Sequence, residues 1–325
     1  MTAVPAPPPA RSLLDHALRG RVALAILVLL LALPPLANAL DGGFYIGLAS
    51  RILIFALAAT SLNLILGFGG MVSFGHAAFV GVGGYTVGIL MQHGVASAWL
   101  AWPMAFVIGG LCALVIGAVC LRTRGVYFIM ITLAFAQMLY YIVISLRDYG
   151  GDDGLSLPAR SSIGLSLSLG QDTVFYYVVL AIGVAAFVGV WRLLNARFGH
   201  VLQALRENET RMAAIGFPVY RYKLTAFALA GALAALAGAL AANQSGIVSP
   251  AAMHWSQSGA LMVMVIVGGV GHLYGGLLGA LALMLLEELA QGYTIHWQFG
   301  VGAVLLLVVL AAPRGLMGLF ARSSS

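Results

Sequence analysis

The amino-acid sequence predicts an all-α fold: a polytopic membrane helix bundle with eight to ten transmembrane helices, some of them short or broken. The 325 residues are 62% hydrophobic and only 8% charged, whereas soluble domains are about 45–50% apolar and about 25% charged. Several apolar runs reach about 20 residues, which is enough to cross the hydrocarbon core of a bilayer. They do not alternate apolar and polar residues as β-barrel strands do, so helices are the expected spanning elements.

Ten apolar segments are candidate spans, and the range of eight to ten arises because the first and the last three are short or interrupted by Gly. They are 22–38, 46–66, 75–92, 98–121, 125–146, 173–194, 224–243, 257–271, 275–291 and 297–313. The first span is followed by Ala37-Asn38-Ala39, which resembles a signal-peptide cleavage site. We expect an uncleaved first helix because further spans follow at once, and cleavage stays the alternative.

The positions of the basic residues predict the orientation. Lys and Arg collect in short cytoplasmic loops, and a cytoplasmic N-terminus places 13 of the 16 on that side. These are Arg11, Arg19, Arg21, Arg122, Arg124, Arg192, Arg197, Arg206, Arg211, Arg221, Lys223, Arg314 and Arg322. Both termini are therefore expected to be cytoplasmic. Residues 1–21 form a largely disordered tail, 22–313 one transmembrane domain with a cytoplasmic loop at 195–223, and 314–325 a C-terminal tail.

Small residues recur four positions apart within several spans, a spacing that lets helix backbones approach closely in lipid. The rows are Gly109-Ala113-Gly117, Gly231-Ala235-Ala239 and Gly271-Gly275-Gly279. Two glycine pairs are also each followed shortly by Gly and His: Gly69-Gly70 before Gly75-His76, and Gly268-Gly269 before Gly271-His272. Chance and an internal repeat, as found in transporters, both stay open.

The sequence lacks the motifs of several enzyme classes. There is no H-E-x-x-H zinc motif and no G-x-S-x-G nucleophile elbow. The single lysine, Lys223, follows no Gly-rich loop, so a Walker A nucleotide site is excluded. Glu287 and Glu288 are the only carboxylates within the spans, and they lie near a predicted helix end, which argues against ion-coupled transport. The chain is predicted to be a passive helix bundle, which acts either alone or with an energy-supplying partner.

The predicted cytoplasmic loop holds a disproportionate share of the charge. Residues Glu207 to Ile215 contain no Gly or Pro and favour a short helix, which Asn208 or Thr210 would cap. Gly216 followed by Pro218 predicts its end. Small and charged residues on this helix would suit a docking partner, and a plain amphipathic surface helix is the alternative that the residues leave open.

Several motifs, in this order, resemble the permease subunits of branched-chain amino acid ABC importers of the LivM type. They are Asn63-Leu64 with GFGGMVSFGHAAFVGVGGY at 67–85, Arg124-Gly125-x-Tyr127-Phe128, GGDDGL at 150–155, Arg206-Glu207-Asn208-Glu209 with Ala213 and Gly216, Tyr222-Lys223, Ser249-Pro250, Gly268-Gly269-x-Gly271, and Pro313-Arg314-Gly315-Leu316-x-Gly318. The resemblance covers most of the chain. Met71, His272 and Tyr274 depart from the family pattern.

The resemblance implies a permease subunit, not an enzyme, that moves branched-chain (aliphatic) amino acids across the bacterial inner membrane. Expected partners are a paralogous permease chain, two cytoplasmic ATP-binding subunits that hold ATP and Mg, a periplasmic solute-binding protein and membrane lipid. No cofactor is expected in this chain and no nucleic acid. Coupling to the ATPases would use Arg206, Glu207, Glu209, Ala213, Ala214 and Gly216.

Polar residues in or beside the spans are candidates for the translocation pathway, because polar side chains inside a membrane are costly. They are Asn63, Ser73, His76, Thr132 and Gln137. For each of them interhelical hydrogen bonding is the alternative role. A related importer for urea or another small polar solute, and a stand-alone channel or uniporter, are the alternative functions.

Overall fold

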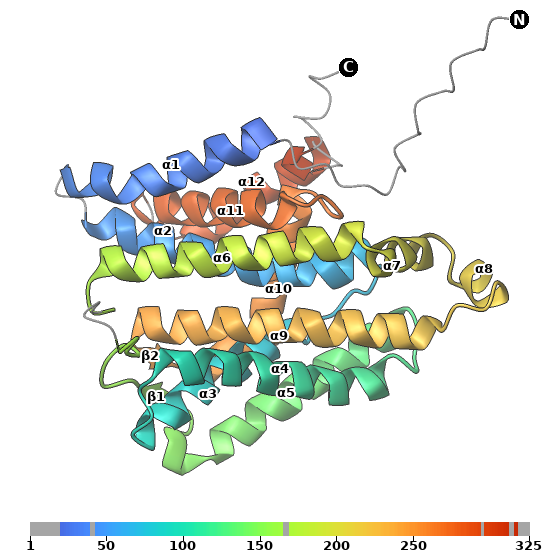
Figure 1. Cartoon of the computed structure of the whole chain (residues 1–325), viewed down its shortest axis with the longest axis horizontal. Helices are drawn as coiled ribbons and strands as arrows, with labels where there is room; N and C mark the ends of the chain where they lie inside the picture. Colours follow the sequence, from blue (N-terminus) through green and yellow to red (C-terminus); the bar gives the residue numbers. More distant parts are fainter. Residues whose placement is uncertain (1–19, 40–42, 165–168, 294–295, 312–314, 318–325) are drawn as a thin grey trace, which may run out of the picture.

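The computed structural model of the chain describes residues 20–39, 43–164, 169–293, 296–311 and 315–317. All ten segments predicted to span the membrane are helical. They are α1 Gly20–Ala39, α2 Gly43–Asn63, α3 His76–Gln92, α4 Ala98–Cys120, α5 Val126–Ser145, α6 Asp172–Asn195, α9 Val219–Ser245, α10 Trp255–Gly268, α11 Gly275–Gln291 and α12 Trp297–Ala311. The structure therefore confirms a predominantly helical fold, in which most long helices lie side by side (Figure 1).

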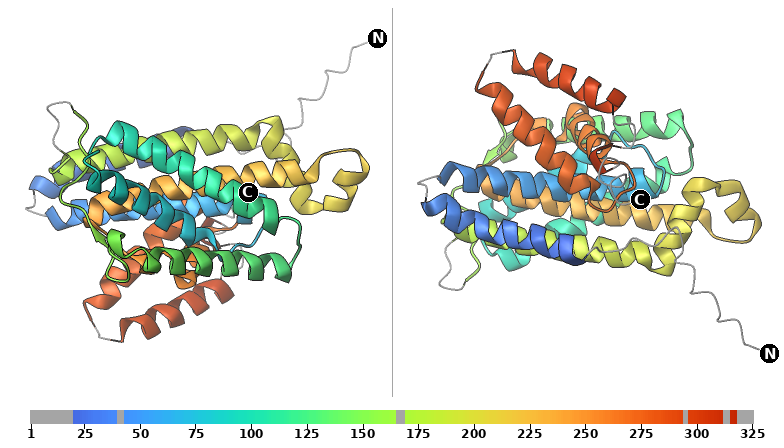
Figure 2. Two further views of the ribbon diagram at one scale, coloured as in Figure 1. Left: turned by 90° about the horizontal axis from the view of Figure 1, so that it is seen from below. Right: turned by 90° about the horizontal axis from the view of Figure 1, so that it is seen from above.

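Within the described residues, five helices are long and apolar enough to cross a membrane: α4, α5, α6, α9 and the helix formed by α2 with its π-helical continuation, which together cover Gly43–Phe68. Shorter apolar helical stretches cover Ala23–Asn38, Trp255–Gly268 and Trp297–Val308. Helices α11 and α12 form a hairpin at one edge of the bundle (Figure 2). This composition fits a polytopic membrane helix bundle.

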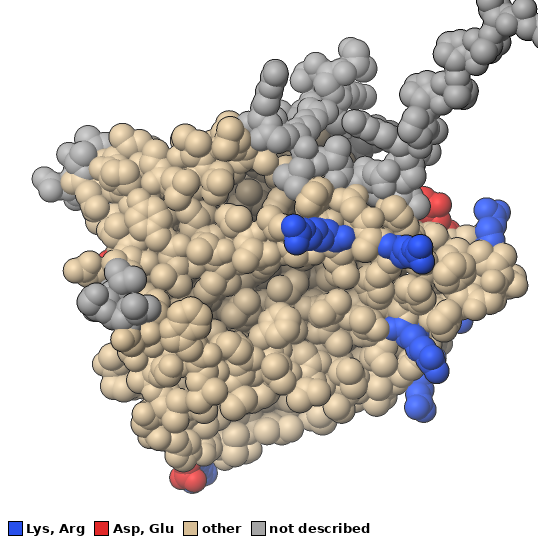
Figure 3. All heavy atoms as spheres, in the orientation of Figure 1, with Lys and Arg blue, Asp and Glu red and all other residues tan. Residues whose placement is uncertain are grey.

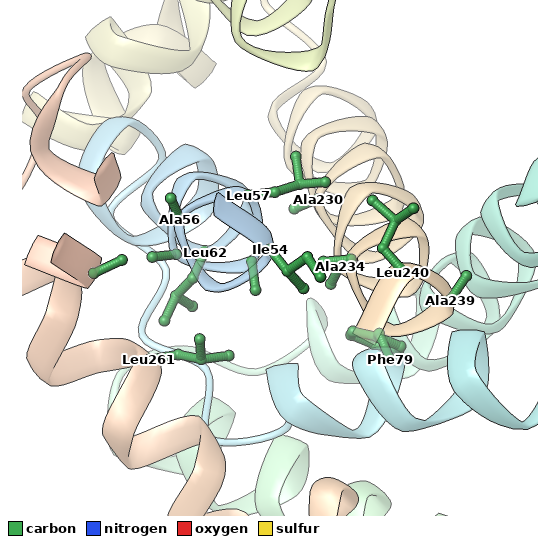
Figure 4. Close-up of a cluster of buried hydrophobic side chains, with 14 of the residues drawn as sticks. Ile54, Ala56, Leu57, Leu62, Phe79, Ala230, Ala234, Ala239, Leu240 and Leu261 are labelled. Carbon is green, nitrogen blue, oxygen red and sulfur yellow. The ribbon is translucent and has the colours of Figure 1, made fainter. Parts of the chain in front are cut away.

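Helix α9 is the centre of the packing. Its Ala-rich sequence buries small side chains against α2, α3 and α4. Figure 4 shows Ala230 and Ala234 of α9 facing Ile54 and Leu57 of α2, with Phe79 of α3 nearby. Small side chains allow close packing of helices without a large loss of rotamer entropy, which suits a membrane interior.

The predicted rows of small residues are indeed packing surfaces. A Cβ atom added at Gly109 of α4 would overlap Ala235 of α9, and one added at Gly231 of α9 would overlap Ala113 of α4. The two rows thus interlock between α4 and α9. In the third row, an added Cβ at Gly279 would overlap the carbonyl oxygen of Met264 in α10.

The segment between α5 and α6 lies at one end of the bundle and is mostly irregular. Its exposed tip includes Asp152 and Asp153. Part of the segment packs against the rest of the chain, because Leu155 and Leu157 are buried. Strand β1 (Leu155–Ser156) pairs antiparallel with β2 (Ile247–Val248), directly after α9.

Three predicted boundaries need correction. Helix α9 begins at Val219, so residues 219–223 are helical rather than part of the loop 195–223; Pro218 occupies its N-cap. Helix α1 begins at Gly20, inside the predicted tail 1–21, of which residues 1–19 lie outside the described residues. In the predicted tail 314–325, residues 315–317 are helical, Gly315 is buried against Gly269, and residues 318–325 are not described.

Candidate functional site

Two short helices between α6 and α9 project beyond one end of the bundle (Figure 1). They are α7, Arg197–Glu207, and α8, Glu209–Ala214. The sequence predicted a single helix over 207–215. Asn208 interrupts it because its backbone is extended (φ −155°, ψ 94°) and its side-chain oxygen caps α8 by accepting a hydrogen bond from the Arg211 backbone N–H at 2.8 Å. Asn208 was one of the two predicted caps.

The end of α8 follows the predicted stop signal. Gly216 adopts a φ of +90°, a left-handed conformation that favours glycine, and its N–H donates to the carbonyl of Ala213. Ala213, Ala214 and Ile215 are exposed, whereas Met212 is buried against the rest of the chain. The tip of the protrusion therefore presents a small apolar surface, which we call the α8 tip and define as Ala213, Ala214 and Ile215.

On the face shown in Figure 3, Lys and Arg side chains gather at the end that carries α7 and α8, while the middle of the bundle is nearly free of charge. Two of the predicted coupling residues make contacts within the chain. The carboxylate of Glu209 lies 2.5 Å from Lys223 Nζ and 3.2 Å from Arg124 Nη2. Glu209 thereby ties α8 to α9 and to the turn between α4 and α5, and it is not a free docking charge.

Arg206, in the last turn of α7, is exposed overall but also makes a contact within the chain. Its Nη1 donates a hydrogen bond to the backbone carbonyl of Gly67, in the π-helical turn Leu64–Phe68 that continues α2. Its neighbour Glu207 is exposed. Of the six predicted coupling residues, five are exposed and Glu209 is half-buried. Arg206 and Glu209 also hold the protrusion against the bundle.

The predicted pathway residues fall into two groups. Ser73, His76 and Thr132 lie around Gly75: the hydroxyl of Ser73 accepts from the Gly75 N–H at 3.3 Å, and a Cβ added at Gly75 would lie 2.5 Å from the carbonyl oxygen of Thr132. All three are buried. Gln137 follows in α5, and its Nε2 atom is buried without a hydrogen-bond partner.

Asn63 makes its hydrogen bonds away from the group around Gly75. Its Nδ2 donates to the carbonyl of His272 at 2.8 Å, and its Oδ1 accepts from the Gly271 N–H at 3.1 Å. The side chain therefore joins the end of α2 to the loop between α10 and α11. The interhelical role that the sequence left open is the one that its contacts fit.

His76 pairs with Ser61 in the interior. The Ser61 hydroxyl oxygen lies 2.7 Å from the carbonyl oxygen of Ala58 and 2.8 Å from His76 Nε2. His76 Nδ1 is buried without a partner. A buried polar atom without a partner is costly, which makes Nδ1 a candidate contact for a polar group on the transported solute.

Sequence reasoning missed Ser61 and Ser258. The hydroxyl of Ser258 in α10 accepts from the Ala77 N–H at 2.9 Å and so satisfies one of the free donors at the start of α3. The two residues are 181 positions apart, and no sequence pattern signals such a pairing. Ser61 lies two residues before the end of α2, in a long apolar span, which is a polar signal of the same kind as Ser73.

An apolar cavity of about 340 Å³ lies between α1, α2, α6 and the start of α11. Its only hydroxyl-bearing lining residues are Thr60 and Tyr274, and it contains none of the predicted pathway residues. Such a lining suits hydrocarbon rather than a zwitterion. Among the described residues, no group of three or more His, Cys, Asp or Glu side chains is placed to hold a metal ion.

We expect replacement of Glu209 by glutamine to loosen the protrusion. The substitution removes both ion pairs, which at partly exposed sites contribute about 0.2–1 kcal/mol each. Limited trypsin digestion of the purified protein should then cut faster after Arg211. Glu207→Gln, which removes an exposed charge two residues earlier, is the matched control and should be cut at the wild-type rate. Equal cutting rates in both variants and in the wild type would refute the role of the ion pairs.

Comparison with known proteins supports the family resemblance seen in the sequence motifs. A family model described as branched-chain amino acid transport system / permease component matches residues 44–310. The high-affinity branched-chain amino acid transport system permease protein LivM of Salmonella typhimurium is 28% identical over 295 residues, which cover 84% of this chain and 69% of that protein. A probable LivM of Methanocaldococcus jannaschii is 25% identical, covering 84% of this chain and 94% of that protein.

A second type of permease is also similar. The high-affinity branched-chain amino acid transport system permease protein LivH of Escherichia coli is 24% identical over 285 residues, which cover 81% of this chain and 91% of that protein. No solved structure matches the chain. The family match extends over most of the sequence and includes both the protrusion and the buried polar residues. The chain therefore belongs to the branched-chain amino acid transport system permease family and is a membrane permease component, not an enzyme.

Proposed function

We propose that this chain is the transmembrane subunit of an ATP-driven importer for branched-chain (aliphatic) amino acids in the bacterial inner membrane. It would work with a paralogous permease subunit, two cytoplasmic ATP-binding subunits that bind ATP and Mg, and a periplasmic solute-binding protein. The printed names of the LivM and LivH relatives support the substrate class. The observation that carries the coupling role is the α8 tip, a small apolar surface at the outermost point of an otherwise charged protrusion.

The proposed orientation places α7 and α8 in the cytoplasm. Arg124, Arg206 and Lys223 all make contacts at this end of the bundle, and clustered basic residues mark the cytoplasmic side. With ten crossings, both termini would also be cytoplasmic. The segment with Asp152 and Asp153 would then face the periplasm, where a binding protein delivers its solute.

The α8 tip is proposed to dock on an ATP-binding subunit together with Glu207 and Gly216. Small side chains permit close approach of a partner backbone, and Gly216 ends the helix so that the chain can return to α9. Closure of the ATP-binding subunits would move the protrusion as a rigid body relative to the bundle. Arg206 and Glu209 would maintain the contact between the protrusion and the bundle during this movement.

The proposed pathway includes Ser73, His76, Thr132 and Gln137. His76 Nδ1 and Gln137 Nε2 are buried polar atoms without partners, so both have hydrogen-bonding capacity to offer a solute. Asn63, by contrast, uses its amide in the contact between α2 and the α10–α11 loop. It is proposed to act on the pathway by positioning rather than by touching solute.

Reconstitution into liposomes tests the proposal. The complete set of permeases, ATP-binding subunits and binding protein should accumulate radiolabelled leucine only when ATP is enclosed with the ATP-binding subunits. Uptake by this chain alone would identify a stand-alone channel or uniporter. ATP-dependent uptake of urea but not of leucine, isoleucine or valine would identify an importer for a different solute.

A further inference from the structure

Arg206, although exposed overall, lies along a slot formed by glycines from two separate segments of the bundle. A Cβ added at Gly70 would lie 3.0 Å from Arg206 Cγ, and one added at Gly271 would lie 2.8 Å from Arg206 Nη1. Both glycines have positive φ values, of 67° and 76°. The slot therefore depends on residues without side chains at the two Gly-rich segments that the sequence singled out.

The slot contains a carbonyl that needs a partner. Carbonyl groups in the last turn of a helix have no intrahelical donor, and Gly67 lies one residue before the end of the π-helical turn that continues α2. Arg206 Nη1 donates to its oxygen. A hydrogen bond from a charged donor is stronger than one between neutral groups, so the attachment of α7 to this turn is specific.

The same point joins the second Gly-rich segment. A Cβ added at Gly67 would lie 2.5 Å from the Gly271 backbone nitrogen, so the two backbones touch. Asn63 connects them further through its hydrogen bonds to Gly271 and His272. We call this contact between the end of α2, the α10–α11 loop and Arg206 the glycine junction, and define it as Asn63, Gly67, Arg206, Gly271 and His272.

We propose that Arg206 is the positioning residue that transmits movement of the α7–α8 protrusion to the glycine junction, and through it to α2, α10 and α11. This inference rests on the proposed function. The junction lies where α2 changes to a π-helical turn and where the loop between α10 and α11 interrupts the helical structure, so a displacement there can change the direction of the adjoining helices. The part of the chain that docks on the ATP-binding subunits and the part that reorients the pathway are thus joined by one guanidinium group.

Arg206→Met isolates this role, because methionine keeps an unbranched stem that fits the slot but lacks the donor. In the complete reconstituted transporter, we expect solute uptake to fall by about tenfold or more, a typical coupling between two sites. ATP hydrolysis stimulated by the binding protein should continue. The measured quantity is the ratio of solute molecules imported to ATP molecules hydrolysed, which a purely structural defect would leave unchanged because both rates would fall together.

Arg206→Lys tests the hydrogen bond itself. It restores a charged donor that reaches the Gly67 carbonyl, and it should recover part of the lost import per ATP. The matched control is Arg197→Ala at the exposed start of α7, which removes the same charge from the same helix away from the junction. That variant should import at the wild-type ratio.

Two results would overturn the inference. If Arg206→Met imports as much solute per ATP as the wild type, the residue transmits nothing. If it loses the bound ATP-binding subunits, Arg206 acts in assembly rather than in transmission. Neither result affects the proposed function, provided that the wild-type complex and the Arg197→Ala variant import leucine with ATP. A wild-type complex that imports leucine without ATP would instead refute the proposed function itself.

Discussion

Replacement of Ala213 by tryptophan is expected to abolish ATP-driven uptake while the protein stays folded in the membrane. Ala213 is exposed within the α8 tip, so a larger side chain there can extend into solvent without entering the core. A partner surface that packs closely on this methyl group would be displaced by an indole ring. A central interface residue contributes about 2 kcal/mol or more, so binding of the ATP-binding subunit should weaken by about thirtyfold or more.

The measurements are co-purification of the ATP-binding subunits with the tagged permease and leucine uptake by the reconstituted complex. Ala159→Trp is the matched control, because Ala159 is also exposed but lies in the segment between α5 and α6 at the opposite end of the bundle. It should leave co-purification unchanged. Wild-type uptake by Ala213→Trp at normal expression would show that α8 does not dock on the ATP-binding subunits.

Replacement of Gly238 by alanine is expected to destabilise the whole bundle. A Cβ at Gly238 of α9 would overlap the backbone carbonyl of Val80 in α3, which cannot rotate away as a side chain can. The two helices would have to separate, and Gly83 of α3 makes the reciprocal approach to the carbonyl of Ala235. Overpacking of a well-packed core costs about 1–3 kcal/mol. Because this clash is with backbone at the contact between α3 and α9, the loss of stability should reach or exceed the upper end of that range.

Thermal unfolding in detergent, followed by the loss of monodisperse protein on size-exclusion chromatography, measures this effect. Gly189→Ala in α6 is the matched control: Gly189 is also inside a long helix, but no atom lies within 4 Å of an added Cβ. Since alanine has the higher helix propensity, Gly189→Ala should unfold at or above the wild-type temperature. Equal stability of the two variants would contradict the close approach of α3 and α9.

The helices were predictable because long apolar runs leave few alternatives in a membrane. The errors lie where charge is high and local signals compete. Helix α7 was not predicted, since Gly199 and His200 weaken its start, and the start of α9 at Val219 was placed too late because Arg221 and Lys223 indicated a loop. Within the same loop, however, Asn208 and Gly216 were identified because capping and left-handed glycine leave local signatures.

The contacts of the site were far less predictable. Sequence reasoning named Arg206 and Asn63 but assigned neither to the contact it makes, because Arg206 and Gly67 are 139 positions apart and the acceptor is a backbone carbonyl. Every residue has a backbone carbonyl, so no sequence pattern shows which carbonyl accepts the hydrogen bond. The two Gly-rich segments were visible in the sequence, but not that they lie close together: Cβ atoms added at Gly70 and at Gly271 would both lie against Arg206.

The 27 residues of α9 have a consequence for how the two faces of the membrane communicate. At 1.5 Å per residue the helix is about 40 Å long. Near one end Lys223 binds Glu209 of α8. At the other, Asn243 accepts from the Ser161 N–H at 2.7 Å, and β2 pairs with β1. A straight rod of that length that tilts by about 5° moves its far end by about 3.5 Å, which exceeds the length of the hydrogen bonds that fasten it. Delivery of solute at the periplasmic surface and nucleotide-driven closure of the ATP-binding subunits would then both move the same helix. Each event would therefore affect the other.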